Sequence, residues 1–259
     1  MKVAGLEYVE IGAGDTPIIC MHGIGGNRAS FAPQLKALAP SHRVIALNLP
    51  GYGGSDAIDP LSFPELAACI VAFLDGLEIE KAHLCGQSIG GMIALETACL
   101  YPARVASLAL IATTAAFGGR DDSFKDAFID ARLAPLDAGQ TLPDLALSFV
   151  PEITGPKAAQ EAITSAIASM AAVPEATYRN IVRCLVTFNR RADITSLNLP
   201  VCLIAGSHDQ NAPAKTMGRM AEKIPGAAFH EIADAGHLVN LEKGPETNAI
   251  LNAFYGILT

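Results

Sequence analysis

The sequence predicts an α/β protein in which a mostly parallel sheet is covered by helices on both faces. Short apolar runs of four to eight residues, punctuated by glycine, alternate with longer stretches of helical spacing. Strands buried on both faces read as continuous apolar runs, so this alternation is typical of a parallel sheet. The strand pattern stops after residue 113 and returns only near residue 200. We therefore expect a helical segment inserted between two strands of one sheet.

The first predicted strands are Ile18–Met21 and Val44–Leu47, which both end in loops that contain glycine. Residues 31–38, which lie between these strands, place apolar side chains at helical spacing. Ser62 and Glu65 have the spacing of a capping box and predict the start of the next helix. Each strand is thus followed by a helix, as a parallel sheet requires.

Further apolar runs follow, again separated by stretches of helical spacing. The run at residues 82–86 precedes Ser88, and a helix that ends at Pro102 follows it. Residues 105–113 form the next buried run. Strand signals return at residues 201–205 and again in "AAFHEI", close to the end of the chain. These runs complete the predicted sheet.

Residues 115–195 contain no convincing strand and carry alanine-rich helical patterns. The sequence therefore predicts a core domain of residues 1–114 and 196–259, with a helical cap inserted at 115–195. Open parallel sheets bind ligands at the carboxyl ends of their strands. An insertion at that edge predicts a lid over the ligand crevice. The alternative is that these helices only fill out the core.

Composition excludes several classes of function. The net charge is −8 and no cluster of lysine or arginine offsets it, so nucleic acid is a poor candidate for a partner. The first residues lack the apolar core of a signal peptide, and no apolar run approaches the roughly 20 residues of a membrane span. Six scattered cysteines without a C-x-x-C pair indicate reduced, buried thiols. We expect a cytoplasmic protein without a membrane partner.

Residues 86–90, Gly-Gln-Ser-Ile-Gly, match the pattern G-x-S-x-G between a predicted strand and a predicted helix. In this context Ser88 is a candidate nucleophile on a tight turn, where neighbouring glycines avoid clashes between strand and helix. A helix that begins near Ile89 directs its N–H groups toward any anion that forms beside the serine. The simpler alternative is that Ser88 only caps the helix.

A serine hydroxyl needs a base, which is most often a histidine oriented by a carboxylate. When the nucleophile lies on such a turn, the chain order is serine, acid and then histidine. His237 follows the last predicted strand and is the expected base. His230 lies inside that strand and should point away from the site. His208 lies beside Asp209 and is expected to be an ordinary loop residue.

The expected acid is Asp209, directly beyond the strand at residues 201–205. The alternative is that Asp209 is a turn residue that caps a helix beginning near Pro213. Asp234 is the second candidate, although its position three residues before His237 is more typical of a turn.

An acyl-transfer site also needs donors for an oxyanion. The backbone N–H of Ile89 is the first expected donor. The second comes from the loop His22-Gly23-Ile24-Gly25-Gly26, where glycine lets the backbone approach closely. We predict that the N–H of Ile24 donates, with Gly25 as the alternative, and that Gly23 lines the substrate site. The spacing of this loop does not match phosphate-binding motifs, and His22 is expected to brace the loop.

Five segments together resemble the α/β-hydrolase superfamily: "HGIGG", "NLPGYGGSD", "GQSIGG", "GSHDQNAP" and "AGHLVNLEK". The resemblance implies an α/β-hydrolase fold with an eight-stranded, mostly parallel sheet, a helical cap, and Ser88, Asp209 and His237 as the catalytic triad. The chain looks most like bacterial enol-lactonases and carboxylesterases. It also resembles carbon–carbon hydrolases of aromatic degradation, but these usually carry a tryptophan where Leu238 stands, and this chain has none.

The sequence thus predicts a serine hydrolase that cleaves a carboxylic ester or enol-lactone of a small organic acid through an acyl-enzyme. No cofactor or metal is expected, and the partner is the small-molecule substrate. If that substrate carries a carboxylate, an arginine of the cap could bind it; the candidates are Arg132, Arg183, Arg190 and Arg191. The alternatives are a carbon–carbon hydrolase, a lyase or perhydrolase with the same triad, and a ligand-binding protein without catalysis. The oligomeric state stays open, with a homodimer as one option.

Overall fold

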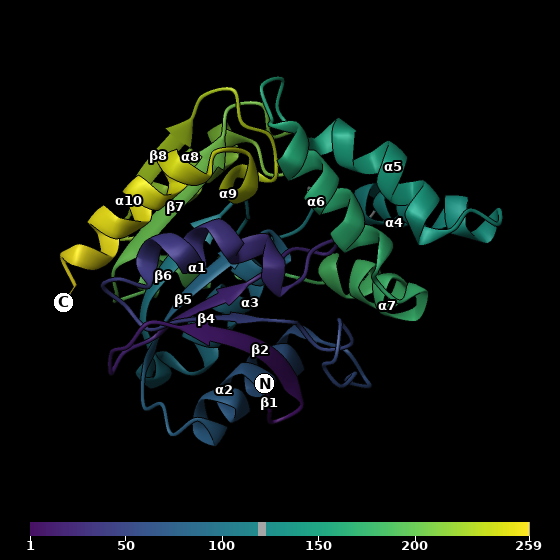
Figure 1. Cartoon of the computed structure of the whole chain (residues 1–259). Helices are drawn as coiled ribbons and strands as arrows, with labels where there is room; N and C mark the ends of the chain where they lie inside the picture. Colours follow the sequence, from purple (N-terminus) through teal and green to yellow (C-terminus); the bar gives the residue numbers. More distant parts are fainter. Residues whose placement is uncertain (119–122, 259) are drawn as a thin grey trace.

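The computed structural model describes residues 1–118 and 123–258. Residues 119–122 of the predicted cap and Thr259 of the predicted core lie outside the described residues. The described part forms an eight-stranded sheet in the order β1-β2-β4-β3-β5-β6-β7-β8 (Figure 1). The pairs β1–β2 and β2–β4 are antiparallel, and all other pairs are parallel. The strands are β1 (Lys2–Val3), β2 (Leu6–Ile11), β3 (Ile18–Met21), β4 (Val44–Leu47), β5 (Ala82–Gln87), β6 (Val105–Ile111), β7 (Val201–Gly206) and β8 (Ala228–Ile232).

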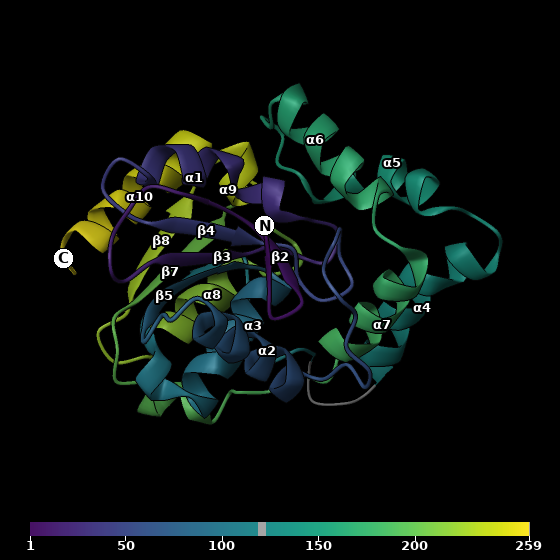
Figure 2. The same ribbon diagram turned by 60° about the horizontal axis from the view of Figure 1, so that its bottom comes forward.

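Helices cover both faces of this sheet (Figures 1 and 2). One face carries α1 (Ala32–Leu38), α9 (Val239–Glu242) and α10 (Gly244–Gly256), and the other carries α2 (Phe63–Gly76), α3 (Ile89–Leu100) and α8 (Ala214–Ala221). Successive side chains of β3 point alternately to the two faces of the sheet and pack against the helices there. Ile18 and Cys20 belong to the apolar cluster of the first face, whereas Ile19 and Met21 belong to the second. The prediction of a parallel sheet buried on both faces is confirmed.

The segment between β6 and β7 is helical. It contains α4 (Ser123–Asp137), α5 (Leu142–Ile153), α6 (Gln160–Ala171) and α7 (Glu175–Leu185), which we call the cap, and these helices form a group beyond one end of the sheet (Figures 1 and 2). The contacts that join this inserted segment to the core include the following two. The buried carboxylate of Glu96 on α3 accepts two hydrogen bonds from Arg190, with N–O distances of 2.6 and 2.7 Å. The hydroxyl of Thr177 donates to the carbonyl of Gly51.

Local sequence signals explain most element boundaries. Ser62 accepts a hydrogen bond from the N–H of Glu65 and opens α2, although the reciprocal half of the predicted capping box does not form. Proline lacks the N–H that a helix would use, so α3 ends before Pro102, which begins the short 3-10 helix Pro102–Arg104. The other 3-10 helices among the described residues are Arg28–Phe31 and Asp193–Ser196.

The N-terminal hairpin formed by β1 and β2 is the main element absent from the sequence prediction. Its turn places Ala4 and Gly5 at φ angles of 46° and 81°. Asparagine or aspartate before glycine would have signalled such a turn, whereas alanine seldom takes a positive φ. The hairpin adds the antiparallel edge to an otherwise parallel sheet.

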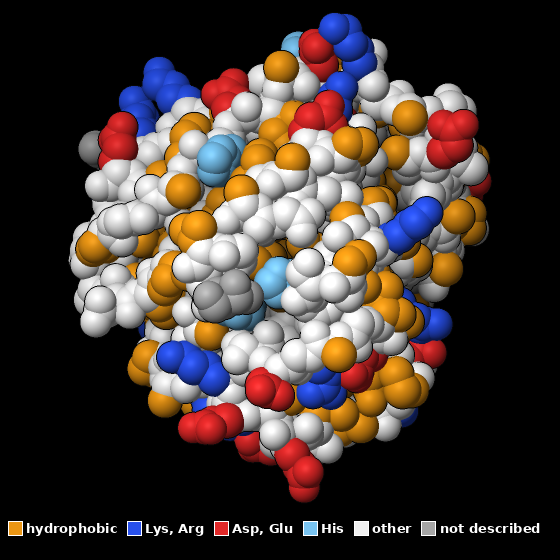
Figure 3. All heavy atoms as spheres, turned by 60° about the vertical axis from the view of Figure 1, so that its left-hand side comes forward, with side chains coloured by type: hydrophobic (Ala, Val, Ile, Leu, Met, Phe, Trp, Pro, Cys, Tyr) orange, Lys and Arg blue, Asp and Glu red, His pale blue; other side chains and the backbone are white. Residues whose placement is uncertain are grey.

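Several features bear on the excluded classes of function. No helix among the described residues is both long enough and apolar enough to cross a membrane. All six cysteines are free thiols. On the face shown in Figure 3, lysines and arginines lie in small groups among acidic residues, and no broad basic patch forms there.

Candidate active site

Ser88 lies at the turn between β5 and α3 in a strained backbone conformation. Its φ and ψ angles are 55° and −120°, outside the regions that L-residues favour. The surrounding chain holds this conformation. The N–H of Ser88 donates to the carbonyl of Ile111 at 2.9 Å, and the hydroxyl of Thr113 donates to the carbonyl of Ser88 at 2.7 Å. The side chain of Ser88 is therefore fixed at the carboxyl edge of the sheet.

Two glycines make this turn sterically possible. A Cβ atom on Gly86 would lie 2.2 Å from the backbone of Gly90, and one on Gly90 would lie 2.1 Å from the carbonyl oxygen of Met21. The first clash is the strand-to-helix contact that the sequence predicts. The second arises because the start of α3 also packs against the end of β3. Any side chain at either position would push the helix away from the strands.

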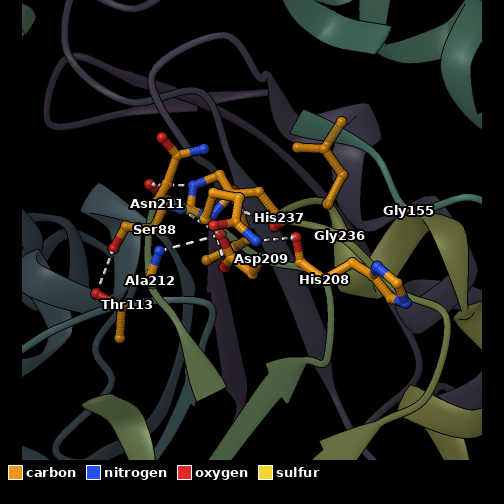
Figure 4. A network of polar contacts seen from close by, with 12 residues as sticks. Ser88, Thr113, Gly155, His208, Asp209, Asn211, Ala212, Gly236 and His237 are labelled. Atoms are coloured by element: carbon orange, nitrogen blue, oxygen red, sulfur yellow. Dashed lines mark hydrogen bonds and ion pairs between the residues drawn. The ribbon is translucent and has the colours of Figure 1, made fainter. Parts of the chain in front are cut away.

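The structure brings the three predicted triad residues together (Figure 4). The Nε2 atom of His237 lies 3.0 Å from the Oγ atom of Ser88, and its Nδ1 atom lies 2.8 Å from Oδ2 of Asp209. These residues come from the turn after β5, the loop after β7 and the loop after β8. Parallel strands present their carboxyl ends at one edge, which is why residues separated by 149 positions in the chain meet there.

The carboxyl group of Asp209 is fully buried and has both oxygens occupied. While Oδ2 faces the imidazole, Oδ1 accepts hydrogen bonds from the N–H groups of Asn211 and Ala212 at 2.8 and 3.0 Å. Burial raises the pKa of this carboxyl, but the neighbouring His237 and the two backbone N–H groups outweigh burial and lower it. Asp209 is therefore ionised near neutral pH. The turn role that the sequence allowed as an alternative coexists with the contact to His237.

Because Asp209 is ionised, its contact with His237 determines which nitrogen of the imidazole carries the proton. A carboxylate only accepts hydrogen bonds, so Nδ1 of His237 must donate to it. In the neutral ring Nε2 is then the acceptor, and it faces the hydroxyl of Ser88. The backbone of the histidine is held as well. Its N–H donates to the carbonyl of Ile153 at 2.7 Å, and its carbonyl accepts from the side chain of Gln87 at 2.9 Å.

The loop at residues 22–26 lies directly beside Ser88. A Cβ atom on Gly23 would lie 3.3 Å from the Cβ of Ser88, so this glycine allows the close approach that the sequence predicts. Gly23, Ile24 and Gly25 all line the cavity described below. Among the described residues, the N–H groups of Ile24 and Ile89 have no hydrogen-bond partner. Both predicted donors are thus available to a bound group.

His22 braces this loop from beneath. Its Nε2 atom accepts from the N–H of Leu49 at 3.0 Å, so Nδ1 carries the proton and donates to the carbonyl of Gly23 at 2.7 Å. Burial lowers the pKa of His22 to about 4, which keeps this pattern at neutral pH. The hydroxyl of Tyr52 supports the next residue by donating to the carbonyl of Ile24.

The rejected candidates lie where the sequence places them. The imidazole of His208 points away from the pair formed by Asp209 and His237 (Figure 4). His230 is exposed on β8. Asp234 forms an ion pair with Lys157 at 2.8 Å and has a positive φ angle, as in a turn. Nowhere in residues 1–118 and 123–258 do three His, Cys, Asp or Glu side chains gather as a metal site would require.

A cavity of about 590 Å³ opens above Ser88 and His237 and extends beneath the cap. Most of its lining is apolar, and the aromatic members are Phe117, Phe124, Phe128 and Phe149. Arg132 of α4 is the one cationic side chain on this lining within the described residues. The cavity therefore has a polar reaction end at the sheet and a largely apolar chamber with a single positive charge.

Arg132 forms no ion pair with any residue that the structure describes, although the carboxylate of Glu152 lies close enough to raise its pKa. Its Cζ atom lies 4.5 Å from the ring centres of both Phe128 and Phe149. Its Nε atom is buried and forms no hydrogen bond within the described part of the chain. Burial lowers the pKa of its guanidinium. Of the other cap candidates, Arg190 is neutralised by Glu96, while Arg183 and Arg191 are exposed.

Sequence reasoning missed several residues that shape the site. Gln87 and Thr113 hold the backbones of His237 and Ser88. Glu242 accepts hydrogen bonds from backbone N–H groups on both sides of His237. Side chains that bond to backbone carry no spacing signature, so only the tertiary structure reveals them. The position of Gln87 beside Ser88 was the single available hint.

Comparison with known proteins places the chain in a family. A family model of the alpha/beta hydrolase fold matches residues 16–244. A dihydrolipoyllysine-residue acetyltransferase component of the acetoin cleaving system from Pseudomonas putida is 31% identical over 96% of this chain, which spans 66% of that protein. The 3-oxoadipate enol-lactonase 1 of Acinetobacter baylyi is 30% identical, with 92% of this chain and 87% of the enzyme covered.

The fold is shared with solved structures. A thermophilic esterase from Thermogutta terrifontis superposes with a TM-score of 0.88 at 23% identity, with coverage of 98% of this chain and 93% of the esterase. The family match covers most of the chain and includes the segments that carry Ser88, Asp209 and His237. The chain therefore belongs to the alpha/beta hydrolase fold family.

Proposed function

We propose that this protein is a serine hydrolase that cleaves an ester or lactone of a small organic acid through an acyl-enzyme. The observation that carries the proposal is the pair of hydrogen bonds that link Ser88 to His237 and His237 to the buried Asp209. Relatives named as an enol-lactonase and as methyl ester esterases support the same class of reaction. In this proposal Ser88, His237 and Asp209 are the catalytic residues.

The first half-reaction forms the acyl-enzyme. Ser88 Oγ attacks the substrate carbonyl carbon as Nε2 of His237 takes the hydroxyl proton. The charge on the carbonyl oxygen is stabilised by the N–H groups of Ile24 and Ile89, which no other group of the described chain occupies. Asp209 stabilises the imidazolium that forms. The bond to the leaving oxygen then breaks, and that oxygen receives the proton from Nε2.

The second half-reaction repeats these steps with water. His237 removes a proton from water, the hydroxide attacks the acyl carbon, and Ser88 leaves with the proton returned from Nε2. The products are the organic acid and the free enzyme. With a lactone, the acid and the released hydroxyl or enol belong to the same molecule. The cap acts as a lid that keeps bulk water from the apolar chamber, and we propose a cytoplasmic setting for this activity.

The substrate class follows from the chamber above Ser88. An apolar chamber of this kind suits an aliphatic or aromatic acyl chain, and Arg132 suits a carboxylate at its far end. The buried Nε atom of this guanidinium has no hydrogen-bond partner among the described residues, and a bound carboxylate would supply one. The two phenylalanine rings hold the guanidinium in one orientation, so little side-chain entropy is lost on binding. We therefore propose an ester or lactone whose acid carries a second carboxylate.

The test is a panel of p-nitrophenyl esters measured with wild-type protein, Ser88→Ala and Arg132→Gln. The panel pairs hemiesters of dicarboxylic acids with neutral esters of equal chain length, and adds enol-lactones, amides and vinylogous diketones. Wild-type protein should turn over esters or lactones and prefer the acidic member of each pair. Ser88→Ala should remove turnover while the protein stays folded.

Arg132→Gln separates the reaction from recognition of the carboxylate. We expect KM for the hemiester to rise about 10- to 100-fold, since a charged hydrogen bond contributes about 1.5–3 kcal/mol. Neutral esters should be cleaved at nearly the wild-type rate. Equal loss for both members of a pair would disprove the carboxylate assignment. Cleavage of vinylogous diketones alone would instead indicate the carbon–carbon hydrolase, and binding without turnover would indicate a receptor.

A further inference from the structure

Glu242 of α9 is a buried carboxylate whose partners are all backbone N–H groups. Its Oε2 atom accepts from Gly155 at 2.7 Å and from Gly236 at 2.8 Å, and its Oε1 atom accepts from Leu238 at 2.9 Å. It forms no ion pair with any residue that the structure describes. Three N–H donors thus stabilise the charge that burial would otherwise disfavour.

These three donors belong to two different parts of the molecule. Gly236 and Leu238 flank His237 in the loop after β8, whereas Gly155 lies in the cap between α5 and α6. One carboxylate therefore holds the backbone on both sides of His237 and also the cap.

The contact between cap and loop is tight. A Cβ atom on Gly155 would lie 2.4 Å from the carbonyl oxygen of Asp234, and one on Gly236 would lie 2.4 Å from the carbonyl oxygen of Ile153. The N–H of His237 also donates to the carbonyl of Ile153, the last residue of α5. Neither backbone can move toward the other by the width of a methyl group without displacing it.

From this arrangement we infer that Glu242 is a positioning residue that couples the cap to His237. It acts through the backbone: the bonds to Gly236 and Leu238 set where the imidazole stands, and the bond to Gly155 ties that placement to the cap. A cap displaced at this end frees Ile153 and Gly155 and releases His237 from its alignment with Ser88. The inference rests on the proposed function, because it assigns a role toward the base of that reaction.

The alternative is that Glu242 has a purely structural role, which stabilises the fold without affecting the alignment of His237 with Ser88. The two differ in what they change for correctly folded molecules. If the role is purely structural, substitution of Glu242 changes the free energy of unfolding but leaves the rate constants of the folded protein unchanged. A positioning residue lowers kcat and the rate at which Ser88 reacts more than it changes KM, because Glu242 does not itself line the chamber, although Ile153 and Leu238 do.

The experiment compares Glu242→Gln with Glu246→Gln, an equal substitution four residues later at an exposed position. An amide presents one acceptor oxygen, and its NH₂ group must face a backbone N–H. Fluorophosphonate labelling reports the reactivity of Ser88, and its final stoichiometry counts folded sites so that rates refer to folded protein. We expect Glu242→Gln to lower kcat and the labelling rate constant by about 10- to 100-fold, as misplacement of a reacting group by about 1 Å does. KM should stay within about threefold, and Glu246→Gln should match wild type.

Gly155→Ala tests the coupling from the cap side, and it carries the test if Glu242→Gln does not fold. Its control is Gly218→Ala, where the added Cβ meets only Phe229 at an ordinary 3.5 Å. Gly155→Ala should lower kcat and the labelling rate as Glu242→Gln does. Wild-type rate constants in folded Glu242→Gln, or in Gly155→Ala, would overturn the coupling. If wild-type protein itself is not labelled, the proposed function fails instead, so the two failures are distinguishable.

Discussion

The two ends of the cavity differ in how completely the chain satisfies its polar groups. At the sheet end, both oxygens of Asp209, both ring nitrogens of His237 and the backbone of Ser88 have partners within the protein. Beneath the cap, the Nε atom of Arg132 and the hydroxyl of Tyr178 are buried and have no partner in the part of the chain that the structure describes. In the described chain, the groups left for a ligand at the sheet end are the N–H groups of Ile24 and Ile89, whereas at the cap end the group left is the buried Nε atom of Arg132.

This difference indicates a division of labour. A set of hydrogen bonds closed within the protein keeps the reacting atoms aligned before any substrate arrives. A partly buried guanidinium whose Nε atom has no hydrogen-bond partner among the described residues instead favours a ligand that supplies an acceptor. Under the proposed function, the core determines the chemistry, and the cap determines which acid is accepted.

The largest effect that would sharpen this comparison is expected from Asp209→Asn. An amide at this position would orient the imidazole in the wrong tautomer, and kcat should fall by about 10⁴-fold. Steady-state hydrolysis of a neutral ester measures this loss. Asp234→Asn is the matched control, because Asp234 is paired with Lys157 at the surface, and it should keep near wild-type activity. Similar losses in both variants would contradict the assignment of Asp209.

The second effect concerns acid stability, which should belong to the core alone. The cap, residues 115–195, contains no histidine, whereas burial lowers the pKa of both His22 and His83 in the core to about 4. Their unfolded pKa lies near 6.5, so the unfolded state binds more protons between these values. Stability is full above about pH 6.5 and falls as the pH drops toward 4, by up to roughly 3 kcal/mol for each histidine.

Urea denaturation at a series of pH values measures this dependence. His83→Phe removes one of the two groups and keeps an aromatic ring against Tyr255, which His83 contacts with ring centres 5.3 Å apart. The slope of stability against pH should fall by less than half in this variant, because burial also lowers the pKa of His42. An unchanged slope would show that other groups cause the acid sensitivity. Below about pH 4, protonation of Asp209, whose pKa is lowered, removes further stability.

The smallest effect compares two buried tyrosines, Tyr52 of the core and Tyr178 of the cap. The hydroxyl of Tyr52 donates to the carbonyl of Ile24, whereas that of Tyr178 has no partner among the described residues. Tyr52→Phe should lower the free energy of unfolding by about 1–2 kcal/mol, because it leaves a carbonyl unpaired. Tyr178→Phe should leave stability unchanged or raise it by up to about 1 kcal/mol. Equal destabilisation by both changes, measured by urea denaturation, would contradict the contrast between the core and the cap.

Much of the core was predictable from local patterns. The strands Ile18–Met21 and Val44–Leu47 appear with the predicted bounds, because strands buried on both faces must be apolar throughout. The positions of Ser88, Asp209 and His237 were also predictable, because each lies in the loop that follows a predicted strand. Their meeting at one edge follows from the parallel order of the sheet.

Other features depend on contacts that the sequence does not encode locally. The N-terminal hairpin was not predicted, because an alanine such as Ala4 does not signal the positive φ angle that the turn uses. From the sequence, four arginines were equal candidates for binding a substrate carboxylate. The structure favours Arg132, because Arg190 is paired with Glu96 and the other two, Arg183 and Arg191, are exposed. Glu242 could not be recognised, because a carboxylate that binds backbone N–H groups across 87 positions leaves no spacing pattern.

The cap leaves and rejoins the core at a single place. Strands β6 and β7 are neighbours in the sheet, and Ala116 and Asn189 pair in an antiparallel bridge where the two connections run together. The inserted segment thus leaves and re-enters the sheet at one place, although contacts with Gly51, Glu96 and Glu242 also hold it to the core. An engineer could graft the cap of another family member between these two positions and change the acids accepted. Such a graft would keep its hydrolytic power only where the new segment again offers a glycine to the carboxylate at position 242.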